Sequence, residues 1–189
     1  MPLFPFNADK FRAALHFLAG QGLPEFDKYR AVKLLFLADK RHLVRFGRPI
    51  VGGIYRALPH GPAPVDALDA ISAAQEGGHE IDGIEFDYGF SYPRIRLRGA
   101  AKTEQLSESE CEALQECAQE YGRKSFAELR ALTHSLPEYE RAWADRGPAN
   151  AAEMRVEDFF EEDPEALPGV KEAMLEDASI REWFEGGRG

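Results

Sequence analysis

The chain has 189 residues, enough for one domain or one domain with an appendage, and 44% of them are hydrophobic, as in globular rather than disordered proteins. Its 23 basic and 33 acidic residues give a formal net charge of −10. This balance argues against a nucleic-acid binder and against binding to anionic membranes, which need a basic face, and it suits either a complementary protein partner or simple solubility.

A first helix is predicted near the N-terminus. Asn7 can cap its start, and Gly20 or Gly22 can close it. Its apolar residues recur with helical spacing at Phe11, Ala14, Leu15 and Leu18. One face of this helix is therefore expected to be apolar.

The second predicted helix, about residues 25–46, is the centre of the molecule. Pro24 suits its start, and Gly47 suits its end because glycine tolerates a positive φ. Apolar residues cover most of its circumference in the middle, so we expect it to be buried with other helices packed on it. Three polar residues interrupt this surface, and because unpaired buried charge is costly, each needs a partner or a place at the surface: Lys33, Asp39 and His42.

The next part of the chain changes from helical to alternating periodicity. A short strand is predicted at about 51–58, followed by a turn at His60-Gly61-Pro62 and a helix that starts at Pro64. Alternating apolar residues then predict strands at about 80–88 and 94–98, joined as a hairpin. Together with residues 51–58 this hairpin could form a small antiparallel sheet.

The second half of the sequence again predicts helices. A serine precedes a glutamate by three residues in three successive capping boxes: Ser107 with Glu110, Ser125 with Glu128, and Ser135 with Glu138. Beyond residue 147 the chain becomes acidic, and its apolar residues keep helical spacing at Val156, Phe159, Phe160, Val170, Met174, Ile180, Trp183 and Phe184. We expect this tail to fold back as short helices or to dock on a partner.

The predicted fold class is therefore α+β and mainly α-helical. Helices pack round the buried central helix, and the strands form a small antiparallel sheet or hairpin. We divide the chain into a main domain, residues 1–147, and an acidic C-terminal helical extension, residues 148–189.

The cysteines and the hydropathy bear on location. Cys111 and Cys117 lie six residues apart on a predicted helix, so they point in different directions and cannot form a disulfide. No apolar run approaches the ~20 residues of a membrane span, and the first ten residues lack the pattern of a signal peptide. We expect two free thiols and a cytoplasmic protein.

The search for chemistry finds one constellation: Asp39, His42, His60 and His134. Asp39 and His42 share a helical face, and the other two lie at loop or helix ends where they could converge on it as a metal or catalytic site. Metal-binding bundles repeat such a pair on a second helix, and this chain does not. The alternative is structural: Asp39 satisfies a buried partner, His134 caps its helix, and His60 orders the turn. We predict no catalytic residues, no metal and no cofactor.

Two blocks of sequence resemble a known family. KLLFLAD, HL, FGRPI, GGIYRALPHGPAP and DAL follow in that order, and LSESECEALQECAQEYG, SFAELRALTH and Trp143 come later. Together they resemble the SocA-type antitoxin domain, also called the Panacea domain and found in phage-associated proteins, over roughly residues 10–145. By residue match, the family's signature positions are Asp39, Gly61, Pro62, Thr133, His134 and Trp143, and His42 and His60 also lie in the matching motifs. These positions either contact a partner or hold the fold.

The resemblance implies a function by binding. SocA-type antitoxins are cytoplasmic partners of a toxin encoded by an adjacent gene, which they neutralise by protein–protein contact. At least one acts as an adaptor that presents its toxin to a Clp-family protease. Two alternatives stay open: a metal-dependent hydrolase built on Asp39, His42 and His134, and a phage-borne protein of the same fold that binds a host protein.

Overall fold

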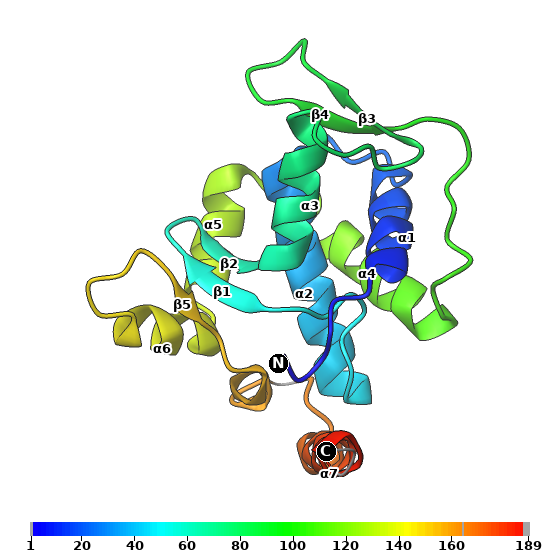
Figure 1. The fold of residues 1–189 in the computed structure, drawn as a ribbon. Coiled ribbons are helices and arrows are strands. Elements are labelled where there is room, and N and C mark those ends of the chain that lie inside the picture. The colour runs from blue at the N-terminus through cyan, green and yellow to red at the C-terminus, as the bar shows by residue number, and fades with distance from the viewer. Residues whose placement is uncertain (1, 164, 187–189) are drawn as a thin grey trace.

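A computed structural model of the chain describes residues 2–163 and 165–186 (Figure 1). Its helices are α1 (Ala8–Ala19), α2 (Lys28–Phe46), α3 (Val65–Gln75), α4 (Glu108–Tyr121), α5 (Phe126–His134), α6 (Pro137–Asp145), the 3-10 helix η1 (Val156–Phe160) and α7 (Val170–Gly186). Its strands are β1 (Tyr55–Leu58), β2 (Gly61–Pro64), β3 (Ile84–Asp87), β4 (Arg94–Leu97) and β5 (Ala152–Glu153). The predicted class, α+β and mainly helical, is confirmed. No helix in these ranges combines the length and the apolarity that crossing a membrane requires.

The central helix is confirmed as the buried core element. Figure 1 shows α2 running through the middle of the molecule with the other elements arranged round it, and every residue from Arg30 to Val44 is buried. It begins at Lys28, later than predicted, because Glu25 has a φ of 52° and Asp27 supplies the N-terminal cap by accepting a hydrogen bond from the Arg30 amide. Gly47 ends it with a φ of 72°, as predicted.

The strands form two separate sheets. β3 and β4 pair as the predicted antiparallel hairpin, whereas β1 lies between β2 and β5 in another antiparallel sheet. The strand predicted at 51–58 therefore does not join the 80–98 hairpin, because both of its edges are already paired. It also starts only at Tyr55, since Gly52 and Gly53 have positive φ values of 67° and 91°. The expected turn lies at residues 59–60, and Gly61 and Pro62 belong to β2.

The predicted capping boxes form in two of three places, and Asn7 caps α1 as predicted. Ser107 with Glu110 and Ser125 with Glu128 form reciprocal capping boxes at the starts of α4 and α5. The third predicted box is wrong: Ser135 ends α5, and α6 begins at Pro137 with no side-chain cap. Glu138 instead lies buried with a carboxylate oxygen 2.9 Å from Lys40 Nζ of α2, and a buried carboxylate gains more from a cation than from a backbone amide.

The described part of the acidic tail folds back on the body of the molecule. Residues buried in the core include Met154, Phe159, Phe160 and Met174. β5 pairs with β1, Asp163 lies 3.1 Å from Lys40 Nζ, and Val170 lies against Gly47 at the end of α2. Ile180 is 53% exposed, so α7 does not bury every apolar position of its pattern. The side chains of Trp183 and Phe184 lie outside the described residues.

Candidate functional site

Asp39 ties the central helix to the loop that leads into β1. Its side chain is 1% exposed, and Oδ1 accepts hydrogen bonds from the amides of Ile50 at 2.8 Å and Val51 at 2.9 Å. The Tyr55 hydroxyl donates to Oδ2 at 2.7 Å. Burial raises the pKa of Asp39 to about 7, although these three donors act in the opposite direction. Both carboxylate oxygens are therefore engaged by the protein itself.

His42 lies one turn further along α2 and has other partners. Its Nδ1 is 2.7 Å from the Arg48 carbonyl oxygen, and its Nε2 is 3.0 Å from Ser109 Oγ. Because a carbonyl only accepts, Nδ1 carries the proton and Nε2 accepts from the serine hydroxyl. Burial lowers the pKa of His42, which favours this neutral form. His42 thus fastens the turn after α2 to α4.

The other signature residues meet where β2 crosses α5. A Cβ on Gly61 would lie 2.8 Å from Thr133 Oγ1, 3.0 Å from Lys33 Nζ and 3.2 Å from His134 Cδ2. Thr133 is buried and donates its hydroxyl proton to the Leu129 carbonyl at 2.8 Å. The absence of a side chain at Gly61 is what allows α5 to approach β2 so closely.

Lys33 is the least expected member of this cluster. Its ammonium group is buried, donates to the Pro62 carbonyl at 2.6 Å and lies 5.2 Å from the centre of the Tyr29 ring. Desolvation by burial lowers its pKa to about 7. Lys33 stands out in the sequence because it lies inside an otherwise apolar helix. That position does not predict its hydrogen bond to the Pro62 carbonyl.

Aromatic rings surround the cluster. His134 packs on Tyr139 with ring centres 4.5 Å apart, and Tyr139 stacks on Trp143 at 5.8 Å. The Tyr139 hydroxyl donates to the Leu58 carbonyl at 2.9 Å, and the Tyr29 hydroxyl donates to the His60 carbonyl at 3.3 Å. Burial lowers the pKa of His134, and its Nε2 is buried without a hydrogen-bond partner among the described residues. The aromatic rings thus hold the β1–β2 hairpin between α2, α5 and α6.

The structure places the four residues that could have formed a metal site in two regions, with His60 and His134 near the β1–β2 hairpin and α5, and Asp39 and His42 further along α2. Gly61, Pro62, Thr133 and His134 come together round Lys33, whereas Asp39 and His42 bond the loop before β1 and the turn after α2. Within the described ranges, no three His, Cys, Asp or Glu side chains are grouped as a metal ion would require. The Asp39, His42 and His134 ligand set is therefore not assembled here.

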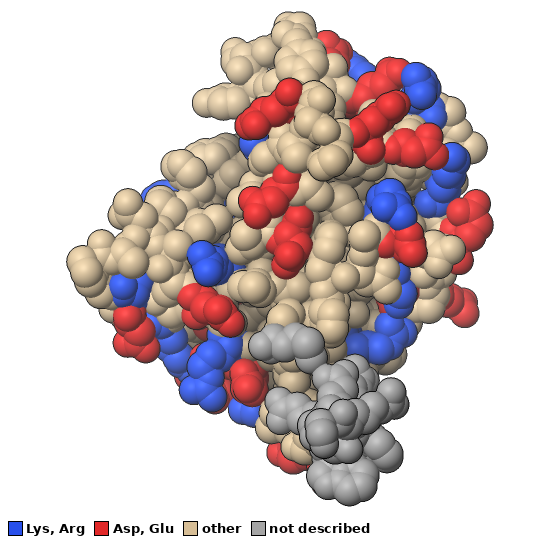
Figure 2. Space-filling model, viewed as in Figure 1, with Lys and Arg blue, Asp and Glu red and all other residues tan. Residues whose placement is uncertain are grey.

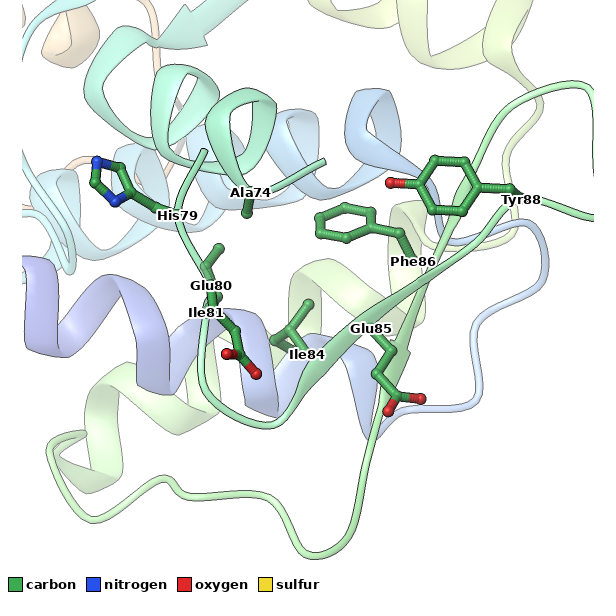
Figure 3. A pocket seen from close by; sticks show the side chains of 8 residues that line it. All are labelled: Ala74, His79, Glu80, Ile81, Ile84, Glu85, Phe86 and Tyr88. Atoms are coloured by element: carbon green, nitrogen blue, oxygen red, sulfur yellow. The ribbon is translucent and has the colours of Figure 1, made fainter. Parts of the chain in front are cut away.

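A second region, at the β3–β4 hairpin, has the character of a surface for binding. A cavity of about 320 Å³ lies between the end of α3 and β3, with Ala74, Ile81, Ile84 and Phe86 among its walls (Figure 3). Beside it the hairpin carries three exposed aromatic side chains: Tyr88 at 62%, Phe90 at 41% and Tyr92 at 74%. The sequence pattern gave the strands here but not this exposed apolar surface.

Polar links from the central helix to the β1–β2 hairpin, α4 and α6 define an α+β domain whose signature residues bond or contact other parts of the chain. The family model of the antitoxin SocA-like, Panacea domain matches residues 32–143, which is more than half of the chain, and the chain belongs to this family. Neither a search of curated proteins nor a search of solved structures found a match. Membership supports an antitoxin role in general and implies a protein toxin as partner.

Proposed function

We propose that this protein neutralises a cognate toxin, encoded by an adjacent gene, by binding it directly and without a catalytic step. The match over residues 32–143 carries the proposal, because it includes most of α2, both hairpins and the helices up to Trp143. The formal charge of −10 and the exposed aromatic residues of the β3–β4 hairpin also suit a protein-binding role. A cytoplasmic location is part of the proposal, and the two free cysteines, Cys111 and Cys117, are consistent with it.

Most signature residues then act by holding the fold. Asp39, His42, Gly61, Pro62 and Thr133 each bond or contact another part of the chain. His60 and Trp143 also have ring partners, Phe126 and Tyr139 respectively. Substitutions at these positions should therefore reduce neutralisation through lost stability, and the loss should be smaller at low growth temperature.

Co-expression with the adjacent open reading frame tests the function. The neighbouring protein alone should arrest growth, co-expression of this chain should restore it, and the two proteins should co-purify. A neighbour that is not toxic, or whose toxicity this chain relieves without forming a complex, would contradict neutralisation by direct binding. His134→Ala tests whether a signature residue contacts the partner. If this variant folds normally but no longer binds the toxin, His134 is a contact rather than a structural residue.

An adaptor role is the finer form of the same proposal, in which the chain presents its toxin to a Clp-family protease. The half-life of the toxin, measured with and without this chain in cells that have or lack the protease, distinguishes the two forms. Degradation that needs both proteins identifies an adaptor, whereas a long-lived complex identifies a simple blocking antitoxin. A pull-down from the native host that recovers only a host protein would favour the alternative of a phage-borne binder.

A further inference from the structure

The outer edge of β3 has free backbone groups. β3 pairs with β4 in a register that places Phe86 opposite Ile95. The Ile95 amide donates in the other direction, to the Phe26 carbonyl at 2.7 Å, so Phe86 and Ile95 form a non-hydrogen-bonded pair. The hydrogen bond from the Arg98 amide to the Gly83 carbonyl agrees with this alternation. The amide and carbonyl of Phe86 consequently point away from β4, and neither bonds to any described residue.

The two edges of this hairpin therefore differ. The outer edge of β4 is covered by residues 26–27, through the Phe26 bond and a bridge between Asp27 and Arg94. The outer edge of β3 pairs with no other strand in the described chain. An open edge is a template on which an extended polypeptide can add as a further strand.

A cavity adjoins this open edge on one face of the hairpin. The alternating side chains of Ile84, Phe86 and Tyr88 line it, and Ala74 of α3 forms the opposite wall (Figure 3). The Tyr88 hydroxyl reaches α3 and donates to the Gln75 carbonyl at 2.5 Å. Because alternate side chains of a strand point to the same face, every second residue of an added strand would lie at this cavity.

The acidic residues near the outer edge of β3 favour a basic segment as the added strand. Asp69, Glu76 and Glu80, on or just after α3, are exposed and form no ion pair with any described residue. Figure 2 shows acidic side chains along α3 with few basic ones beside them. An added segment that carries lysine or arginine between its apolar residues would complement this face, whereas an acidic segment would be repelled.

We propose that β3 binds the toxin by strand addition: an extended toxin segment with alternating apolar and basic residues pairs with the Phe86 edge and places its apolar side chains in the cavity beside Ala74. This inference rests on the proposed function, since it names the surface that the toxin occupies. The exposed rings of Phe90 and Tyr92 extend the contact beyond the strand.

Hydrogen exchange tests the strand addition directly. In the free protein the amide of Phe86 exchanges fast, and in the complex with the protein encoded beside this chain it becomes protected at least 10-fold. The amides of Glu85 and Asp87 are internal controls, because the alternation directs both toward β4 in either state. A complex in which Phe86 stays unprotected overturns the inference but leaves the proposed function standing, whereas failure to form any complex overturns the proposed function.

Variants test the cavity and the charge. Ala74→Phe, which fills the cavity from α3, should weaken binding at least 10-fold. Glu76→Lys with Glu80→Lys should weaken it similarly and reduce its dependence on salt. Glu104→Lys with Glu112→Lys changes the net charge equally at exposed residues that do not line the cavity, and it should bind like wild type.

Two results would overturn the assignment. Equal weakening by both pairs of charge reversals would show that only the net charge matters. Protection of the Phe86 amide in the free protein that increases with its concentration would show that the occupant is a second copy of this chain.

Discussion

Gly61 and Thr133 lie so close that a Cβ on the glycine would be 2.8 Å from the threonine hydroxyl oxygen. Gly61 also has a φ of 96°, a conformation that residues with a side chain rarely adopt. Gly61→Ala should therefore lower the free energy of unfolding by about 2–4 kcal/mol, from backbone strain together with overpacking. Urea denaturation measures the change.

Gly77→Ala is the control that separates the two effects. Gly77 has a similar φ of 78°, but a Cβ there would meet nothing within 4 Å. It should lose only about 1–2 kcal/mol from the backbone. Equal losses at both glycines would mean that the approach of α5 to β2 does not constrain residue 61.

Asp39→Ala should destabilise the protein more than the loss of any one of the three groups that donate to it. It leaves the buried amides of Ile50 and Val51 and the Tyr55 hydroxyl without their acceptor, and each such loss costs about 1–3 kcal/mol. Tyr55→Phe removes one donor and leaves the carboxylate with two, so it should cost about 1 kcal/mol. Thermal unfolding of both variants shows which is less stable. A loss of stability in Tyr55→Phe equal to that in Asp39→Ala would contradict the prediction.

Asp39 also shows what the sequence could and could not predict. A carboxylate within an apolar helix must find partners, so its burial with hydrogen bonds was predictable. The identity of those partners was not, because Ile50, Val51 and Tyr55 are brought to Asp39 by the path of the chain after α2, which includes positive φ values at Gly52 and Gly53. That backbone path is a property of the tertiary fold rather than of residue spacing.

The wrong capping box at Ser135 and the strand β5, which the sequence did not predict, have the same origin. Ser135 and Glu138 have the spacing of a capping box, but a tertiary contact with Lys40 takes the carboxylate away from the helix start. β5 has only two residues, too few for any alternating pattern, and it exists because β1 has an edge to pair. Local patterns predicted the elements, while contacts between distant segments decided their pairing and the arrangement of the site.

Glu110 and Glu128 occupy the same capping-box position in two different environments. The Glu110 side chain is fully buried and accepts hydrogen bonds from Lys10 and Arg48 as well as from the Ser107 amide. Glu128 is exposed, and among the described residues its side chain bonds only to Ser125. Glu110→Gln should therefore destabilise the protein by about 2–3 kcal/mol at neutral pH, and Glu128→Gln should have a smaller effect.

Lowering the pH should remove the difference in unfolding free energy between the wild type and the Glu110→Gln variant. Burial alone would raise the pKa of Glu110, but its hydrogen bonds and the two cations lower it from 4.5 to about 2. Because the folded state holds the proton less tightly than the unfolded state, the stabilisation is complete above pH 4.5 and is lost as the pH falls toward 2. A difference in unfolding free energy that stays constant down to pH 2 would contradict this assignment.

Lys33 should make the stability of the protein rise in the alkaline range. Burial lowers its pKa from 10.5 to about 7, so between these values the unfolded state binds a proton that the folded state has released. The free energy of unfolding then increases with pH, with a slope from this group that approaches about 1.4 kcal/mol per pH unit.

The Lys33→Met variant removes the titration and keeps an apolar side chain of similar length. Urea denaturation from pH 7 to 10 compares the two proteins, and other groups that titrate there cancel in the difference. Parallel profiles would show that Lys33 keeps its charge when buried, with the Pro62 carbonyl and the Tyr29 ring as sufficient partners.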